Sequence, residues 1–177
     1  MTSSDTFSTP SSTPFSAGAI RTVVVDWADA RGVELRAAMD REMTERYTGR
    51  HDDDPDFAVK AAVAFAVDPA DILAVVLALD DAGEAIGHAA LRTLDGRFEI
   101  KRVVVAPHAR GRGVGLTLMA AIEAEALRLG AETVILQTGD RQPDAVAMYG
   151  KIGYELIPTY DPYKPVTNSI CFEKRLG

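Results

Sequence analysis

Glycines and arginines that could hold a polyanion lie together near the middle of the chain. The run Arg110-Gly-Arg-Gly-Val-Gly115 follows a β-branched, apolar stretch and precedes a helical pattern. The start of a helix offers unpaired backbone N–H groups and the positive end of the helix dipole, so it attracts anions. Glycine lets phosphate oxygens approach the backbone, and arginine supplies forked, permanently charged donors. The run therefore predicts a diphosphate site made by Arg110, Gly111, Arg112, Gly113, Val114 and Gly115.

The spacing of this run argues against the two commonest ligands of Gly-rich turns between a strand and a helix. A P-loop requires Lys and then Ser or Thr directly after its last glycine, whereas Leu116 and Thr117 follow Gly115. A dinucleotide-binding G-x-G-x-x-G motif requires its third glycine at the position of Leu116. A nucleotide-binding regulator that takes ATP or NAD is therefore the weaker alternative.

The run resembles the motif Arg/Gln-x-x-Gly-x-Gly/Ala, which binds acetyl-coenzyme A in the GNAT superfamily of N-acetyltransferases. The likeness covers about the last 110 residues, from the strand at Ile72 onward, and includes Glu99 on a strand, Gln142, and the Tyr149 segment. It implies an α/β domain of the mixed α+β kind. In such a domain helices flank a twisted, mixed, mostly antiparallel sheet, and a β-α-β unit forms the acetyl-coenzyme A cradle.

The resemblance implies direct transfer of an acetyl group from acetyl-coenzyme A, the co-substrate, to a primary amine of a small molecule or a protein. Glu99 stands where the superfamily often has its general base, although an ion pair with Lys101 on the same strand face is an equal alternative. Tyr149 matches a tyrosine commonly placed near the coenzyme A sulfur. Its alternative is a core position in line with Ala145 and Ile152.

The resemblance also implies backbone contacts to the cofactor, and two positions depart from the family pattern. The N–H groups of Val103, Val104 and Val105 would bind the pantetheine amides and the thioester oxygen if their strand parts from its neighbour. Gln142 stands where many members have an Asn that contacts the cofactor, and it keeps an amide. Gln137 stands where relatives tend to have Glu, a difference that bears on the acceptor.

A second alternative to an N-acetyltransferase is a non-catalytic module that binds or senses acyl-coenzyme A.

Length and composition predict one domain. The chain has 177 residues, 47% of them hydrophobic, and we expect a disordered Ser/Thr/Pro-rich tail at 1–18 followed by a single domain at 19–177. The net charge of −7 disfavours nucleic acid as a partner. No apolar run approaches the roughly 20 residues of a membrane span. We therefore expect a cytoplasmic protein without a membrane partner, and the resemblance implies a homodimer whose interface the residues do not indicate.

Charge is unevenly distributed along the chain. Residues 97–112 carry five cations against one acid, a local charge of +4, whereas residues 40–56 carry seven acids against three arginines, a local charge of −4. The acidic stretch is typical of a solvated helix face and loop. The alternative hypothesis is that it attracts a cationic acceptor, and charge reversal of Asp52, Asp53 and Asp54 tests that hypothesis.

Cysteine and histidine indicate neither a disulfide nor a metal site. Cys171 is the only cysteine, and we interpret it as a small buried hydrophobe rather than an acyl-enzyme nucleophile. The three histidines are scattered along the sequence. The acids at 52, 54 and 56 imitate a calcium loop, but Phe57 replaces its glycine and Val63 replaces its glutamate. We therefore expect no metal.

Hydrophobic periodicity and turn residues predict the elements that position these groups. Asp95-Gly96 is a hairpin signal, and the Pro- and Tyr-rich loop at 158–165 is expected to shape the acceptor side. The helix expected at 57–67 has a pattern that also fits a strand. Strands are expected at 20–27, 72–79, 85–93, 98–105, 133–138, 154–157 and near 169–174, and further helices after Asp29, at 113–129 and at 144–151.

Overall fold

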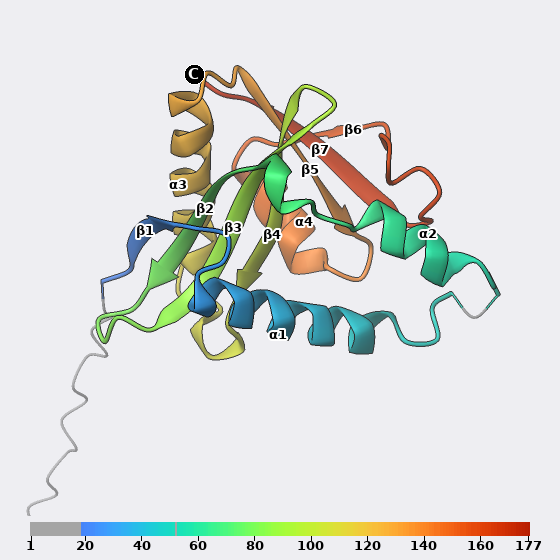
Figure 1. Cartoon of the computed structure of the whole chain (residues 1–177), viewed down its shortest axis with the longest axis horizontal. Coiled ribbons are helices and arrows are strands. Elements are labelled where there is room, and N and C mark those ends of the chain that lie inside the picture. The colour runs from blue at the N-terminus through green and yellow to red at the C-terminus, as the bar shows by residue number, and fades with distance from the viewer. Residues whose placement is uncertain (1–18, 52) are drawn as a thin grey trace, which may run out of the picture.

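The computed structural model describes residues 19–51 and 53–177, so the tail expected at 1–18 lies outside the described residues. Figure 1 shows one twisted sheet with helices on both of its sides. The strands are β1 (Arg21–Val25), β2 (Ile72–Leu79), β3 (Ala85–Leu94), β4 (Arg97–Val105), β5 (Thr133–Gly139), β6 (Glu155–Ile157) and β7 (Ser169–Arg175). The α-helices are α1 (Ala30–Tyr47), α2 (Phe57–Ala64), α3 (Val114–Arg128) and α4 (Pro143–Lys151).

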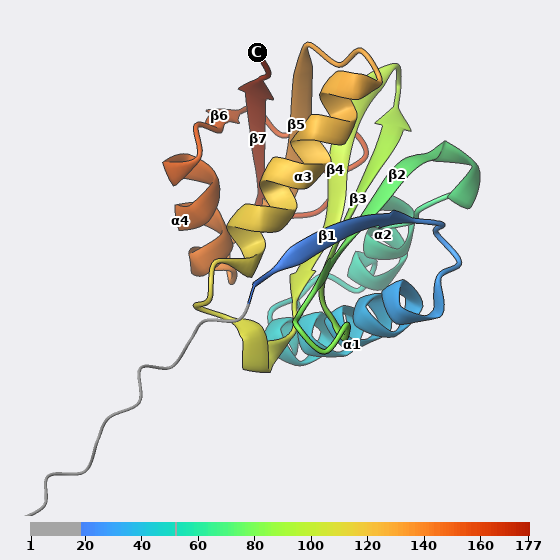
Figure 2. The same cartoon turned by 90° about the vertical axis from the view of Figure 1, so that its left-hand side faces the viewer.

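The sheet has the order β1-β2-β3-β4-β5-β7-β6. Every neighbouring pair is antiparallel except β4 and β5, which are parallel and joined through α3. Helices α3 and α4 lie on one face of the sheet and α1 and α2 on the other (Figure 2). The expected mixed, mostly antiparallel sheet with flanking helices is thereby confirmed.

Local sequence explains where the elements near the site begin and turn. Asp29 caps α1, because its side chain accepts a hydrogen bond from the Arg31 N–H. Asp95 and Gly96 both have positive φ angles, 49° and 75°, as a two-residue hairpin turn requires. This turn sets Leu94 opposite Arg97 and so fixes the register of β3 against β4.

The main hydrophobic core lies between α3 and the sheet. Leu118, Met119 and Ile122 of α3 are at most 1% exposed, and they pack with buried residues of the strands. Burial of one such side chain contributes about 1.5–3 kcal/mol, so these contacts hold the start of α3 firmly at the end of β4. The motif at 110–115 is therefore attached to a rigid scaffold.

Most expected elements are present, and apart from shifts of one residue at element ends the main differences are these. The second helix ends at Ala64, three residues earlier than expected, and β1 is shorter than expected at both ends. The C-terminal strand β7 lies between β5 and β6 and pairs with β5 along seven residues, an arrangement that hydrophobic pattern alone did not predict. Within the described residues no helix combines the length and the apolar character that crossing a membrane requires.

Candidate functional site

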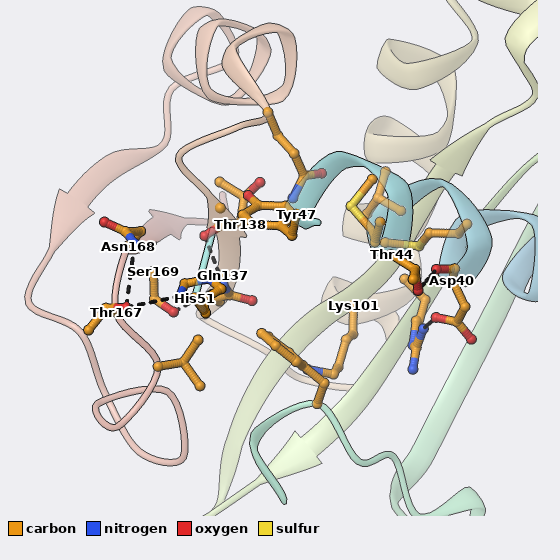
Figure 3. A pocket seen from close by; sticks show the side chains of 18 of the residues that line it. Asp40, Thr44, Tyr47, His51, Lys101, Gln137, Thr138, Thr167, Asn168 and Ser169 are labelled. Atoms are coloured by element: carbon orange, nitrogen blue, oxygen red, sulfur yellow. Dashed lines mark hydrogen bonds and ion pairs between the residues drawn. The ribbon is translucent and has the colours of Figure 1, made fainter. Parts of the chain in front are cut away.

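Strands β4 and β5 part in the middle of the sheet. They pair only at Glu99 with Ile135 and at Ile100 with Leu136, and beyond these residues each strand continues without the other. A cavity of about 310 Å³ opens at this fork, between α1, the β4–β5 gap and the segment before β7 (Figure 3). The separation that the sequence resemblance implied is present, and the cavity is the candidate site. Its polar lining includes Asp40, Thr44, Tyr47, His51, Lys101, Arg102, Gln137, Thr138, Gln142, Tyr149, Thr167, Asn168 and Ser169.

A β-bulge on β4 accompanies the fork. The register of β3 against β4 shifts between His88 and Ala90, and Arg102 adopts a φ of 57°, a strained value for a residue with a side chain. The Nδ1 atom of His88 lies 2.8 Å from the Arg102 carbonyl oxygen, and its Nε2 atom lies 3.0 Å from Arg36 Nη1. Arg36 can only donate, so Nε2 accepts and Nδ1–H donates to the carbonyl. A neutral histidine thereby holds the bulge.

The environment of His88 favours that neutral form. His88 is fully buried, and burial lowers its pKa from 6.5 to about 4, with the nearby charges of Arg36 and Arg102 acting in the same direction. The guanidinium of Arg36 lies over the Trp27 ring, 3.6 Å from the ring centroid, and donates to the Trp27 carbonyl. These contacts fix the histidine and, through it, the bulge.

The backbone of β4 presents alternate N–H groups to the gap. The Ala106 N–H donates to the Ile86 carbonyl of the neighbouring chain segment, so by alternation the Val104 N–H also faces β3. The N–H groups of Val103 and Val105 then face the side on which β5 has departed. This orientation favours Val103 and Val105 over Val104, and the expected ligand contact stays a prediction for all three residues.

The start of α3 is open to solvent. Gly113 caps the helix with a φ of 84°, Gly111 has a φ of 74°, and no atom lies within 4 Å of a Cβ built on either glycine. Gly113 has no side chain that could cap the helix, so the first N–H groups of α3 are available. The exposed side chain of Arg112 extends from the same turn. This geometry suits a bound phosphate or diphosphate.

Two other residues of the motif are in contact with the rest of the protein. Arg110 Nη2 lies 2.5 Å from a carboxylate oxygen of Glu42 on α1, and its Nε donates to the Val105 carbonyl at 3.2 Å. A Cβ at Gly115 would lie 2.9 Å from Met148 Sδ, so this glycine allows α3 and α4 to pack closely. Arg110 therefore also joins α1 to the end of β4.

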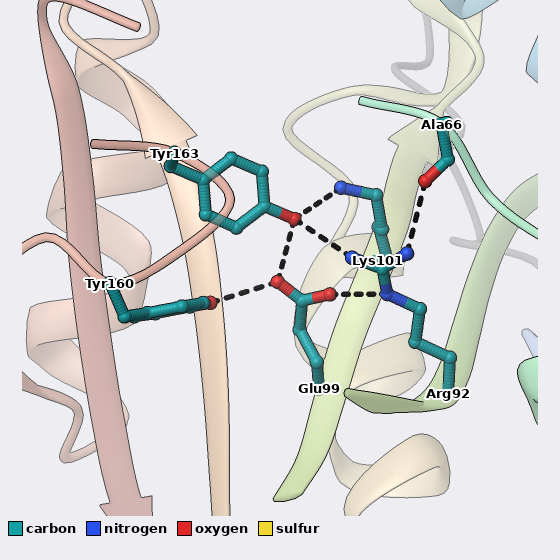
Figure 4. Close-up of polar contacts among 6 residues, drawn as sticks. All are labelled: Ala66, Arg92, Glu99, Lys101, Tyr160 and Tyr163. Atoms are coloured by element: carbon teal, nitrogen blue, oxygen red, sulfur yellow. Dashed lines mark hydrogen bonds and ion pairs between the residues drawn. The ribbon is translucent and has the colours of Figure 1, made fainter. Parts of the chain in front are cut away.

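Glu99 lies in a buried polar cluster beside the cavity (Figure 4). It is 0% exposed, and its Oε2 atom lies 2.5 Å from Arg92 Nε. The hydroxyl groups of Tyr160 and Tyr163 donate to its Oε1 atom at 2.9 and 2.7 Å. The ion-pair partner is Arg92 and not Lys101, which corrects that expectation. Both oxygens of Glu99 are engaged, and Glu99 does not line the cavity.

Tyr163 links this cluster to the cavity. Lys101, which lines the cavity, donates from Nζ to the Tyr163 hydroxyl. Burial raises the pKa of Tyr160 and of Tyr163, so both hydroxyl groups stay protonated. Residues 158–165 thus hold Glu99, whereas the residues that follow, Val166 to Ser169, line the cavity. The expectation that the loop itself shapes the acceptor side is corrected accordingly.

Tyr149 lies on the wall of the cavity, on α4. Its ring packs against those of Tyr154 and Phe172, with centroids 5.7 Å away in each case, and burial raises the pKa of its hydroxyl. Tyr149 therefore belongs to the core and also lines the cavity, so the core interpretation is confirmed and a role near the coenzyme A sulfur stays a prediction. Gln137 and Gln142 line the same wall, and the Gln137 amide donates to the Thr138 carbonyl at 2.8 Å.

The acidic stretch at 40–56 is partly neutralised by cations of the same chain. Asp40 pairs with Arg102, and Glu42 pairs with both Arg110 and Arg46. Asp54 pairs with Lys60, while Asp52 lies outside the described residues. These pairs reduce the field that was expected to attract a cationic acceptor.

Cys171 is 1% exposed and packs with Ala64, Tyr163 and Val166 in a small second core. Burial raises the pKa of its thiol, which opposes formation of a nucleophilic thiolate. The interpretation as a buried hydrophobe is confirmed. Within residues 19–51 and 53–177 no three His, Cys, Asp or Glu side chains are grouped to hold a metal ion.

Sequence reasoning missed four residues of this region, namely Arg92, Tyr160, Tyr163 and His88. A signal for one of them was available, because the two-residue turn that sets Leu94 opposite Arg97 also sets Arg92 opposite Glu99. No comparable signal existed for the tyrosines, which lie more than 60 positions from Glu99 in the sequence.

Comparison with known protein families gives one match over most of the chain. Residues 24–154 match the model of the acetyltransferase (GNAT) family. An IAA acetyltransferase of Azospirillum brasilense is 38% identical over 90 residues, which are 51% of this chain and 59% of that protein. An uncharacterized N-acetyltransferase of Schizosaccharomyces pombe is 31% identical over 100 residues, 54% of this chain and 60% of that protein. The chain thus spans about three fifths of the length of these curated relatives.

Solved structures share the fold. A protein assigned as an acyl-CoA N-acyltransferase from Klebsiella pneumoniae superposes with a TM-score of 0.71 at 28% identity, covering 89% of this chain and 98% of its own. A GNAT family acetyltransferase from Elizabethkingia anophelis with acetyl-CoA bound gives a TM-score of 0.62 at 16% identity, again covering 89% and 98%. At that identity the second likeness concerns the fold alone.

Proposed function

The chain belongs to the GNAT family of acetyltransferases, and from this premise we propose that it transfers an acetyl group from acetyl-coenzyme A to an amine. The observation that carries the proposal is the alignment of three features along one side of β4. These features are the open helix start at 110–115, the unpaired side of the strand at Val103 and Val105, and the cavity at the fork.

The residues present fit acetyl-coenzyme A. The open N-terminus of α3, with Arg112 beside it, suits the diphosphate, and the free N–H groups of Val103 and Val105 suit the amides of an extended arm. Gln142, on the cavity wall, keeps an amide that could contact the arm. When bound, the cofactor supplies the acetyl thioester. The N–H groups on β4 would stabilise negative charge on an oxygen placed against them.

Tyr149 is the proposed proton donor to the departing thiolate. Its hydroxyl is protonated at neutral pH, burial raises its pKa further, and the residue lies on the cavity wall. A positioned acid of this kind contributes about 10²–10⁴-fold in rate. Replacement by phenylalanine preserves the packing against Tyr154 and Phe172 and removes only the hydroxyl.

Glu99 is the proposed proton acceptor, and the hydrogen bonds to its carboxylate limit when it can accept a proton. An alkylamine has a pKa of about 10.4, so it must lose a proton before it attacks. The hydroxyl groups of Tyr160 and Tyr163 both donate to the Oε1 atom of Glu99, which does not line the cavity. Glu99 can act on an amine only when one of these hydroxyl groups leaves its Oε1 atom, and both tyrosines lie on the loop at 158–165.

Both carboxylate oxygens of Glu99 already have hydrogen-bond partners. This favours a second candidate function, an acyl-coenzyme A sensor that binds the cofactor without turnover. Thiol release from acetyl-coenzyme A in the presence of a panel of primary amines separates the two functions. We expect amine-dependent release, and we expect Tyr149→Phe to lower kcat about 10²-fold with coenzyme A affinity unchanged.

Tyr154→Phe is the matched control for this experiment. It removes a second buried hydroxyl, which donates to Glu123 away from the cavity, so its kcat should stay near that of the parent protein. Tight binding of acetyl-coenzyme A with no release for any amine would support the sensor instead. Failure to bind acetyl-coenzyme A would exclude both functions.

A further inference from the structure

The walls of the cavity are mainly apolar and aromatic. Met39, Met43 and Tyr47 of α1 lie on one side, and Phe57 and Phe65 at the ends of α2 lie near another. Such walls favour an acceptor with an apolar or aromatic body, because burial of that body is stabilising by about 25 cal/mol per Å². Polar specificity must then come from the polar groups that interrupt these apolar walls.

In the part of the chain that the structure describes, two ion pairs lie at or beside the cavity, and Lys101 on the cavity wall belongs to neither. Asp40 pairs with Arg102, and Glu99 pairs with Arg92 on the neighbouring strand. Among the described residues no carboxylate lies within ion-pair distance of Lys101 Nζ. Its hydrogen-bond partner is the neutral hydroxyl of Tyr163, and its Nζ also lies 4.6 Å from the centroid of that ring. The cluster of Arg92, Glu99 and Lys101 therefore has an excess positive charge beside the cavity.

We propose that Lys101 binds a carboxylate of the acceptor, so that the preferred acceptor is an amine with an apolar body and an acidic group. This inference rests on the proposed function of the same cavity and names its substrate class. An ammonium group on a cavity wall that has no carboxylate within ion-pair distance gains a charge-assisted hydrogen bond when a carboxylate binds to it. In Figure 3, Lys101 lies between the polar group at Thr167–Ser169 and the α1 side chains Asp40 and Thr44, so an acceptor that occupies the cavity meets it. The proposal replaces the expectation of a cationic acceptor.

The titration of Lys101 agrees with this role. Burial lowers its pKa from 10.5 to about 8, Arg92 and Arg102 act in the same direction, and Glu99 opposes them. Asp40 of α1 also lines the cavity, but it is paired with Arg102. A bound carboxylate would raise the pKa of Lys101 again. The affinity for an acid should therefore fall as the pH rises above about 8, where free Lys101 loses its proton.

The test compares acids with their neutral amides. We would measure by calorimetry the binding of L-phenylalanine and L-methionine, and of their primary amides, to the full chain with and without saturating coenzyme A. We expect the acids to bind about tenfold more tightly than the amides at pH 7. Lys101→Met should abolish this preference with the affinity for the amides within about twofold, and Lys101→Arg should retain it in part.

Lys164→Met is the matched control, because it removes a lysine that pairs with Asp161 on the surface outside the cavity, and it should leave the preference intact. An affinity for coenzyme A equal to that of the parent protein would show that Lys101→Met is folded. Equal binding of acids and amides, no binding of any acid, or a preference that survives Lys101→Met would overturn the proposal. If the protein preferred acids to amides in a way that depends on Lys101 but did not bind coenzyme A, the anion site would be supported and the proposed acetyl transfer would be excluded.

Discussion

The open helix start at 110–115 and the buried cluster around Glu99 lie at opposite ends of β4 and are built in different ways. The helix start uses consecutive residues, and its functional groups are backbone N–H groups and an exposed arginine. The cluster collects Arg92, Glu99, Tyr160 and Tyr163 from two strands and a distant loop, and its charges are removed from water. The first region exposes its central residues, Gly111 to Gly113, to solvent, whereas the second region is buried within the fold.

The largest expected effect tests the buried cluster. Arg92→Met leaves Glu99 buried without its counter-ion and should lower the free energy of unfolding by about 3–5 kcal/mol. Arg97→Met is the control, because Arg97 pairs with Glu173 while both side chains are more than 40% exposed, and it should cost less than about 1 kcal/mol. Urea denaturation followed by fluorescence measures both. If both variants lost a similar free energy of unfolding, the buried cluster would not be the part of the fold that we infer it to be.

The second effect concerns the bulge that His88 holds. The pKa of His88 is about 4 in the folded protein and 6.5 in the unfolded chain, so the unfolded chain binds more protons between these values. Stability from this group is present above pH 6.5 and is lost as the pH falls toward 4, by about 2 kcal/mol between pH 7 and pH 5. Denaturation at the two pH values should show this loss in the parent protein and a smaller loss in His88→Asn. An unchanged pH dependence in His88→Asn would contradict the prediction.

The smallest effect on stability is expected at the helix start, together with a clear effect on binding. Gly113→Ala forces a side chain into a φ of 84° and should cost about 1–2 kcal/mol, while the added methyl group enters the space proposed for a phosphate. Gly130→Ala is a close match, because Gly130 has a φ of 90°, nothing within 4 Å, and lies just beyond the other end of α3. Calorimetry with acetyl-coenzyme A should show weaker binding for Gly113→Ala alone. Equal affinities for the two variants would argue against the diphosphate site.

The motif at 110–115 and the order of strands and helices could be predicted from the sequence because they depend on short-range geometry. Glycine permits positive φ angles at Gly111 and Gly113, and a two-residue turn at Asp95-Gly96 sets the register of its hairpin. The same register would have identified Arg92 as the partner of Glu99, in place of Lys101. Local rules thus fix which side chains face one another across a short turn.

Only the tertiary structure decided how β4 and β5 separate, where β7 inserts, and what surrounds Glu99 and Lys101. Tyr163 reaches both residues from more than 60 positions away, and the separation of the strands is accompanied by a bulge at which His88 contacts the Arg102 carbonyl. These arrangements follow from the packing of distant segments, for which the periodicity of each segment carries no information. The helix start that we propose to bind an anion is therefore encoded locally, whereas the surroundings of the proposed acceptor site arise from long-range contacts.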